Sequence, residues 1–328
     1  MKGRWSPAQW TRCWETGTVT TFHGRFANNY NGVVRRHWHG IFDRLPTHAR
    51  IVDLATGNGA VALLAARYSH RRQRDFEITA IDFADIDPQR RLAGKAVARH
   101  LPRIRFLGGT RIERTTLSGG TLDLAMSQFG FEYAQADEAV AEVDRILKRS
   151  GGLFAAMIHH ADSAIVRQAK DGIEQVANCE QSGLQRLIRK LHRRLHKLKK
   201  RRRDSTKDDR AIALRTEINT RLAQLNRASA RFRDPGPMNL FVRQSMSTFD
   251  PSVAAGLSVD RKLSMLQDAA AETEAYRQRM RDLVSCALGD AEIGALASRL
   301  ADAGFSIEQS HPFVFEGVHF CHALVASR

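Results

Sequence analysis

The chain of 328 residues is long enough for a full α/β core and a second module, since domains usually contain about 100–200 residues. Its formal net charge is +16, and the stretch from Gln181 to Arg233 holds most of it, with eighteen Lys and Arg against four acids. The four cysteines are far apart and no signal peptide or long apolar run occurs, so we expect a cytoplasmic protein without a membrane span, a disulfide framework or a metal site.

The first fifty residues are rich in aromatic and histidine side chains and are expected to form a helical cap. After them, a short apolar strand ends at Asp53, Gly57 and Gly59 follow, and a helix begins near Val61. Glycines let the backbone approach a ligand closely, and the helix N-terminus offers N–H groups to polar or anionic atoms. The sequence therefore predicts a ligand cradle at this loop.

Two classes of cofactor use such a loop. The spacing of Gly57 and Gly59, with Asp82 further along the chain, satisfies a loose dinucleotide fingerprint. A dinucleotide loop has no need of a carboxylate at position 53, however. Asp53 therefore favours the other class of cofactor.

The remaining elements alternate between strand and helix, which predicts a parallel sheet, and the chain ends in two consecutive strands. In such sheets ligands bind at the carboxyl ends of the strands. The expected strands are 76–81, 103–107, 153–158, 306–315 and 319–326, with a further strand at the start of the stretch 122–133, and the expected helices between them include 88–100, 140–148 and 293–303.

The run Asp53-x-Ala55-x-Gly57-x-Gly59 resembles motif I of the class I S-adenosylmethionine-dependent methyltransferases, and the stretch 122–133 resembles their motif IV. The resemblance covers about residues 20–160 and 290–328. It implies an α/β fold with a doubly wound, mostly parallel, seven-stranded Rossmann-like sheet whose last strand is antiparallel. It also implies S-adenosyl-L-methionine as the cofactor, with Asp82 on the ribose hydroxyls.

The segment from Arg25 to Asn31 is similar to the N-terminal segment of ubiquinone- and menaquinone-type methyltransferases, which implies that Tyr30 lies near the cofactor carboxylate. Asn31 replaces the acid that is usual after the tyrosine. Arg111 stands where relatives often place an Asp on the adenine, so we expect backbone groups near Arg111 to bind the adenine. The cofactor-binding residues implied by the resemblance are Tyr30, Asp53, Ala55, Thr56, Gly57, Gly59, Asp82, Phe83, Arg111, Ile112, Ser127, Gln128 and Phe129.

A hydroxyl or amine acceptor must lose a proton when it is methylated. His159 and His160 follow a predicted strand, and Glu132 lies in the motif IV stretch, so these three are the candidate catalytic bases. His23 and His37 are further candidates.

Residues 163–289 replace a connection that needs only a few dozen residues in the family. Two series of apolar residues at steps of three and four predict an antiparallel coiled-coil hairpin over about 184–232. The stretch Arg186–Arg203 contains eleven basic residues and no acid, and such like charges repel along a helix. A polyanion or an acidic partner would offset this repulsion, and a homodimer formed through the insertion is a further option.

The sequence thus predicts an N-terminal helical cap over 1–50, a discontinuous methyltransferase core over 51–162 and 290–328, and a helical insertion over 163–289. Three functions stay open. The first is a methyltransferase for an unknown small-molecule or lipid-intermediate acceptor. The second is an RNA or ribonucleoprotein methyltransferase whose basic hairpin binds phosphates. The third is a non-catalytic cofactor-binding scaffold with a partner-binding arm.

Overall fold

The computed structural model describes residues 7–22 and 26–328, and the chain divides into two compact units. Unit 1 consists of Met1–Val166 and Asp282–Arg328, and unit 2 is Arg167–Arg281. The two boundaries fall within helices α6 (Ala164–Gln181) and α11 (Val259–Cys286). Unit 2 is therefore inserted into unit 1 by two helices that each contribute to both units.

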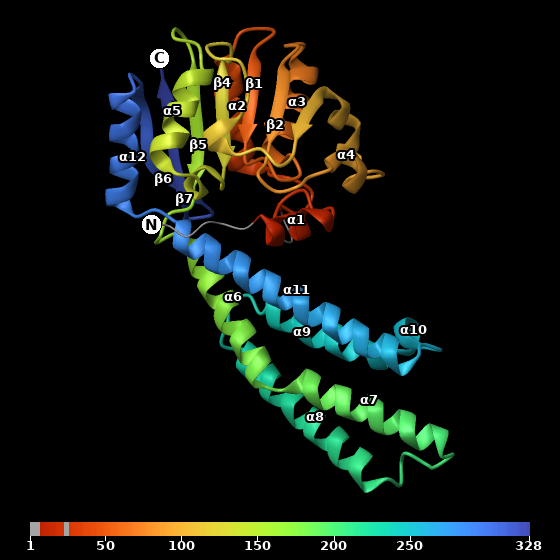
Figure 1. The fold of residues 1–328 in the computed structure, drawn as a ribbon. Helices are drawn as coiled ribbons and strands as arrows, with labels where there is room; N and C mark the ends of the chain where they lie inside the picture. Colours follow the sequence, from red (N-terminus) through yellow and green to blue (C-terminus); the bar gives the residue numbers. More distant parts are fainter. Residues whose placement is uncertain (1–6, 23–25) are drawn as a thin grey trace. The chain divides into compact units, whose positions relative to one another are not determined.

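Unit 1 is built on a seven-stranded sheet of order β3-β2-β1-β4-β5-β7-β6 (Figure 1). The first five strands are parallel, and β7 runs antiparallel to both β5 and β6. This arrangement confirms the predicted class of fold. The strands are β1 (Arg50–Leu54), β2 (Glu77–Ile81), β3 (Ile104–Leu107), β4 (Leu124–Gln128), β5 (Leu153–Ile158), β6 (Ser306–Phe315) and β7 (Val318–Ser327).

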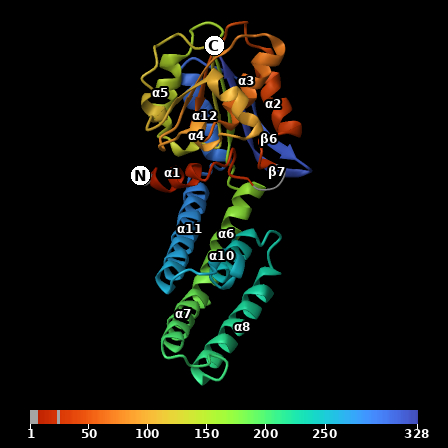
Figure 2. The ribbon, with the colours of Figure 1, turned by 90° about the vertical axis from the view of Figure 1, so that its right-hand side faces the viewer.

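Helices cover both faces of this sheet. On one face, α5 (Ala136–Ile146) and α12 (Asp290–Asp302) pack their apolar stripes against the strands. In α5 the stripe contains Val140, Val143 and Ile146, which recur at the three-residue spacing of one helix face and are at most 4% exposed. Helices α2 (Gly32–Asp43) and α3 (Ala60–Arg72) lie on the other side of the sheet (Figure 2).

One predicted helix of unit 1 is wrong. The stretch 88–100 forms the single turn α4 (Pro88–Arg91) and then the 3₁₀ helix η2 (Ala96–Arg103). Between them Gly94 has a φ of 77°, a left-handed conformation that glycine adopts without strain and that ends a helix. The sequence pattern of apolar residues did not reveal this break.

Unit 2 is helical. It contains α7 (Leu184–Lys200), α8 (Asp209–Ser229), α9 (Gly236–Met246), η5 (Ser247–Phe249) and α10 (Pro251–Ala254) together with most of α6 and α11. The predicted pair of helices, α7 and α8, lies side by side in both ribbon views. Ile188 and Leu191 of α7 and Ile218 and Leu225 of α8 belong to one buried cluster.

That cluster also includes Met238 and Phe241 of α9 and Leu266 of α11. The two helices therefore bury their apolar residues against α9 and α11 as well as against each other. Coiled-coil packing and a homodimer formed through the insertion remain predictions. Among the described residues, no helix combines the length and the apolar character needed to cross a bilayer.

Candidate functional site

The loop after β1 is held by Asp53, the last but one residue of that strand. Its Oδ2 accepts hydrogen bonds from Thr56 Oγ1 at 2.6 Å and from the backbone N–H of Ala62 in the first turn of α3 at 3.0 Å. The side chain is buried, at 1% exposure. Burial raises the pKa of Asp53 to about 7, although these two hydrogen bonds oppose the rise. Asp53 thus joins the strand, the loop and the helix.

Asp82, at the end of β2, holds the same loop from the neighbouring strand. Its Oδ2 accepts from the backbone N–H of Gly57 at 2.7 Å, and its Oδ1 accepts from that of Ala84 at 2.7 Å. Burial raises the pKa of Asp82 to about 6. Each carboxylate oxygen accepts about two hydrogen bonds, so the group keeps capacity for further donors.

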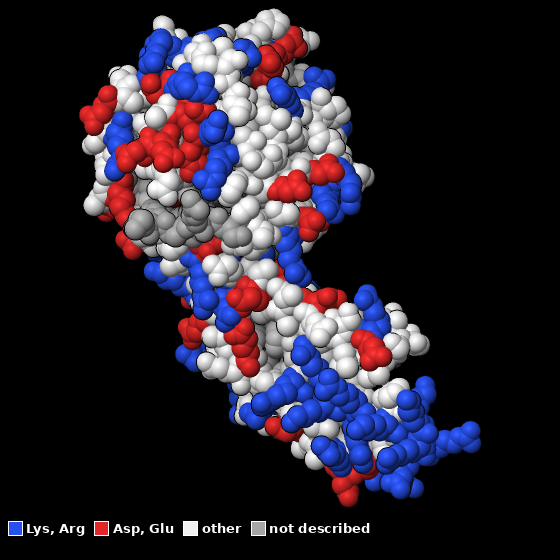
Figure 3. Space-filling view, in the orientation of Figure 1, with Lys and Arg blue, Asp and Glu red and all other residues white. Residues whose placement is uncertain are grey.

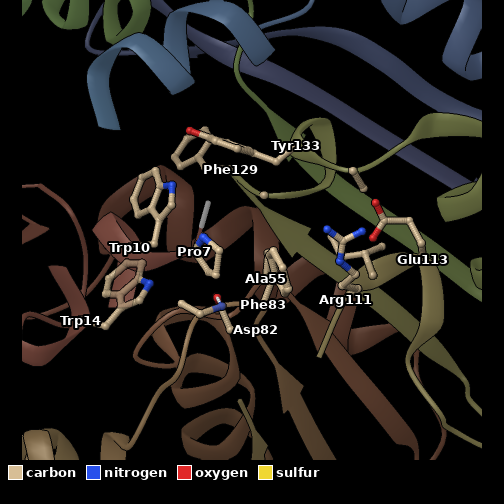
Figure 4. Close-up of a pocket in the computed structure, with 14 residues that line it drawn as sticks. Pro7, Trp10, Trp14, Ala55, Asp82, Phe83, Arg111, Glu113, Phe129 and Tyr133 are labelled. Atoms are coloured by element: carbon tan, nitrogen blue, oxygen red, sulfur yellow. Dashed lines mark hydrogen bonds between the residues drawn. The ribbon is translucent and has the colours of Figure 1, made fainter. Parts of the chain in front are cut away.

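A cavity of about 130 Å³ lies at the carboxyl ends of β1, β2 and β4 (Figure 4). Trp10 and Trp14 lie on one side of it, and Arg111 and Glu113 lie on the opposite side. The Arg111 guanidinium carbon lies 4.4 Å from the centre of the Phe83 ring, a cation–π distance. Six predicted cofactor-binding residues line the cavity: Ala55, Asp82, Phe83, Arg111, Ile112 and Phe129.

The tryptophans belong to α1 (Ala8–Glu15), which lies directly on the glycine loop. Gly57 has a φ of 56°, and a Cβ atom placed on it would overlap the Trp14 ring. The Asn58 side-chain amide donates to the carbonyl oxygens of Trp14 at 2.9 Å and Thr18 at 2.7 Å. The abundance of aromatic residues in the first fifty positions was the only sequence signal for this cover.

Two non-glycine residues that line the cavity have left-handed backbones, Ala55 with a φ of 57° and Phe129 with a φ of 63°. Such conformations cost about 1–3 kcal/mol each and cluster at functional sites. Gly130 allows the loops after β1 and β4 to meet, because a Cβ atom on it would overlap the Cβ of Ala55. Two of the nine non-glycine residues with a positive φ in the described chain therefore lie where these loops face the cavity.

The other predicted cofactor-binding residues do not line the cavity. Ser127 Oγ donates to the Leu54 carbonyl oxygen at 2.8 Å, and Gln128 Oε1 accepts from Trp38 Nε1 at 2.6 Å. Tyr30 is buried in an aromatic cluster, with its ring centre 5.5 Å from that of Phe26. The residues outside the cavity lining are Tyr30, Asp53, Thr56, Gly57, Gly59, Ser127 and Gln128.

Two of the three candidate bases lie together. His159 Nδ1 is 2.6 Å from Glu132 Oε1, and the backbone N–H of His159 donates to the same oxygen at 2.8 Å. Within the described residues, neither the buried Glu132 Oε2 nor His159 Nδ1 has a hydrogen-bond partner, because the 2.6 Å contact between Nδ1 and Oε1 is not aligned as a hydrogen bond. The His159 ring stacks on Phe129, with ring centres 4.5 Å apart, and Phe129 lines the cavity. This pair therefore adjoins the cavity through Phe129.

His160 does not accompany His159. Its Nε2 lies 3.1 Å from Asp290 Oδ1, and its ring centre lies 4.6 Å from that of His319. His37 does not line the cavity either, and burial lowers its pKa to about 4. His23 lies outside the described residues. Within residues 7–22 and 26–328, no group of three or more His, Cys, Asp and Glu side chains is arranged to hold a metal ion.

Neither a protein-family profile nor a curated protein sequence matches the chain. Solved structures do match it. A proposed S-adenosyl-L-methionine-dependent methyltransferase from Methanococcus maripaludis is 27% identical, over 37% of this chain and 53% of that one, at a TM-score of 0.31. Geranyl diphosphate C-methyltransferase from Streptomyces coelicolor is 12% identical, over 47% and 65%, at 0.34. An S-adenosylmethionine-dependent methyltransferase from Aquifex aeolicus is 10% identical, over 99% of both chains, at 0.45.

The order and direction of the strands are those of the Rossmann-like fold of class I methyltransferases, as the sequence predicts. All three structures are described as methyltransferases, and the Streptomyces structure contains S-adenosyl-L-homocysteine. The chain spans only 53% and 65% of the length of the first two. Such partial likeness leaves the activity and the acceptor to be argued from the site itself.

Proposed function

We propose that the protein is an S-adenosylmethionine-dependent methyltransferase and that its acceptor is a small molecule or a lipid intermediate. The observation that carries this proposal is the position of Asp82. It binds the backbone of the glycine loop and presents its carboxylate to the cavity at the sheet edge where open α/β sheets bind ligands. A buried acid with a raised pKa in a cleft is typical of a functional site.

The residues of the cavity suit the nucleoside end of this cofactor. Asp82 accepts one backbone N–H on each oxygen and retains lone pairs for two ribose hydroxyls. Phe83 and Ile112 supply apolar walls for a planar base. Arg111, which lies over the Phe83 ring, is the side chain that a base would have to displace or contact.

The structure leaves less space for the amino acid end of the cofactor. Trp14 lies on Gly57, and the cavity of about 130 Å³ is smaller than the 300–1,000 Å³ of usual ligand sites. Helix α1 must therefore shift when the whole cofactor binds. The bound cofactor would supply a methyl group on a positively charged sulfur. Trp10, Trp14 and Phe129 offer ring faces to such a cation, and each cation–π contact contributes about 0.5–2 kcal/mol.

The paired side chains of Glu132 and His159 are the candidates for removing the acceptor proton. Glu132 Oε1 lies 2.6 Å from Nδ1 of the imidazole, so a small rotation of the ring would let the carboxylate hold that nitrogen and leave Nε2 for the acceptor. Phe129 stacks on the imidazole, and its backbone already has a strained conformation. A rotation of Phe129 would connect the imidazole with the cavity.

The lining of the cavity favours a small acceptor. Aromatic side chains supply much of its wall, and α1 covers one side of it. A folded RNA would need an open approach to the reacting atom. The RNA and scaffold alternatives are tested by incubating the protein with labelled S-adenosylmethionine and fractionated cell extract. Label in RNA would support the second function, and no transfer to any fraction would support the scaffold.

S-adenosylmethionine should stabilise the fold and NAD should not, because Asp53 and Asp82 together suit an amino acid attached to a nucleoside. At about one hundred times its dissociation constant, a ligand of the native state adds about 2.7 kcal/mol to the free energy of unfolding. Thermal unfolding with each ligand measures the difference. A shift with NAD alone would contradict the proposed cofactor.

Replacing Glu132 with Gln or His159 with Asn should reduce methyl transfer by about 10²- to 10⁴-fold, the usual contribution of a general base. Cofactor binding should change little, since neither side chain lines the cavity. Transfer of label into the active fraction of the extract measures the rate. His160→Asn is the matched control, because His160 is the next residue and bonds Asp290 instead. Equal losses in all three variants would contradict the assignment.

A further inference from the structure

Unit 2 contains a groove of its own, of about 560 Å³, which lies within the 300–1,000 Å³ typical of ligand sites. One wall is a face of α7, and the rest comes from α6, α9 and α11. Four basic residues of α7 line it, Arg186, Arg189, Lys190 and Arg193. Their spacing of three and four residues places them on one side of the helix. The groove is therefore lined by one basic helix face.

These four side chains have no acidic partner in the part of the chain that the structure describes. The buried Nε of Arg189 lacks a hydrogen-bond partner there as well. Like charges at this spacing repel one another by a few tenths of a kcal/mol per pair. An anion in the groove would relieve the repulsion and bind the guanidinium groups.

Other basic residues of unit 2 form ion pairs with acids. Arg194, next to the groove residues in sequence, forms an ion pair with Asp208. Glu180 lines the groove but is engaged by Arg277, with Nη1 and Oε2 2.6 Å apart. Acids thus neutralise basic side chains around the groove and leave those inside it unpaired.

The basic face extends beyond the groove. Continuing at steps of three and four residues from Arg193, it reaches Lys197 and Lys200 near the end of α7. From Arg186 to Lys200 the helix rises about 21 Å, at 1.5 Å per residue. Lys and Arg side chains gather over this part of unit 2 on the face that Figure 3 shows. Charges repeated over this length match a polyanion better than a single phosphate.

The apolar residues of the groove favour a nucleic acid over an acidic protein as its ligand. Its apolar side chains are already covered, with Leu184 at 0%, Cys179 at 1% and Phe241 at 5% exposure. A partner helix binds through apolar or aromatic anchors that fill pockets, and little apolar surface is offered here. Phosphate groups need only the basic side chains.

We propose that the face of α7 formed by Arg186, Arg189, Lys190 and Arg193 binds the phosphodiester backbone of a nucleic acid. The inference concerns unit 2 alone and does not depend on the proposed methyl transfer. It predicts little sequence preference, because backbone contacts carry no base information. It also predicts affinity that falls steeply with salt, since each neutralised phosphate releases counterions.

The test uses the full chain and a fluorescent oligouridylate of about 20 nucleotides, longer than one binding site. The groove variant combines Arg186→Gln, Arg189→Gln, Lys190→Gln and Arg193→Gln. At about 0.7 per phosphate for single strands, the log–log salt slope should become shallower by about 3, with at least a tenfold loss of affinity at low salt. The matched control loses the same charge outside the groove, through Lys207→Gln, Arg210→Gln, Arg227→Gln and Arg233→Gln.

The control variant should keep its affinity within about threefold, because its four substituted side chains are exposed and do not line the groove, so water and salt screen their charges. Equal losses in the two variants would overturn the proposal, since net charge and not the groove would then govern binding. Competition by polyglutamate as effective as that by RNA would also overturn it in favour of an acidic protein. Similar binding of single-stranded DNA would support it, because the phosphodiester is common to both. Circular dichroism confirms that each variant is folded.

Discussion

Replacing Asp82 with Ala should weaken the binding of S-adenosylmethionine by about 10²- to 10⁴-fold. Two ribose hydroxyls that donate to an ionised carboxylate contribute about 1.5–3 kcal/mol each, and every 1.4 kcal/mol is a factor of ten. The same substitution leaves the backbone N–H groups of Gly57 and Ala84 without their acceptor. Titration calorimetry measures the affinity directly.

Asp85→Ala is the matched control for this experiment. Asp85 lies three residues further along the chain, is exposed and does not line the cavity. Asp82→Asn removes the charge but keeps the size of the side chain. The amide retains one acceptor oxygen and turns an NH₂ group toward one of the backbone donors. If the Ala and Asn variants both bind the cofactor as the wild type does, Asp82 only stabilises the loop and the proposed function loses its main support.

Much of the fold could be predicted because the signals are local. The strands Leu153–Ile158 and Ser306–Phe315 begin and end as expected, since each is a run of suitable residues bounded by turn signals. The predicted helix 88–100 failed at Gly94, whose positive φ depends on the turn that the chain makes there. A lone glycine within an apolar pattern does not reveal its backbone conformation.

The sequence predicted which loops form the candidate site, but it did not predict the side-chain contacts within it. The sequence placed Asp53 and Asp82 at strand ends, where the structure has them. It could not show that Asp53 bonds Thr56 and Ala62, or that Trp14 lies on Gly57. Both facts depend on how side chains pack in three dimensions. The contact of His160 with Asp290, which lies 130 residues further along the chain, likewise could not be read from the sequence.

Asp53→Asn should increase the free energy of unfolding above neutral pH. The carboxyl binds its proton more tightly in the folded chain, with a pKa of about 7, than at the ordinary value of 3.8. The protonated carboxyl therefore contributes stability that is fully present below about pH 4. This stability is lost as the pH rises through about 7. At about 1.4 kcal/mol per unit, ionised Asp53 costs the fold up to about 4 kcal/mol.

The Asn side chain can accept from Thr56 and Ala62 as the carboxylate does but carries no charge. Urea unfolding of the two proteins should therefore give similar stabilities near pH 4 and a variant that is more stable by a few kcal/mol near pH 8. Asp82, whose pKa is raised to about 6, changes stability in the same direction in both proteins, and because its charge also raises the pKa of Asp53, the measured difference includes the coupling between the two carboxylates. The 1% exposure of Asp53 indicates that its carboxyl is desolvated. A difference in stability between variant and wild type that stays constant from about pH 4 to about pH 8 would contradict this.

The same substitution tests why the protein keeps a costly acid at this position. If Asp53 faces the amino group of the cofactor, the ammonium stabilises the ionised carboxylate and binding must release a proton near pH 7. Affinity should then rise as the pH increases from about 6 to about 8, and Asp53→Asn should bind more weakly and without this dependence. Calorimetry in two buffers of different ionisation enthalpy measures the protons released. Binding without proton release would mean that Asp53 serves only to fasten the glycine loop to α3 through Thr56 and Ala62.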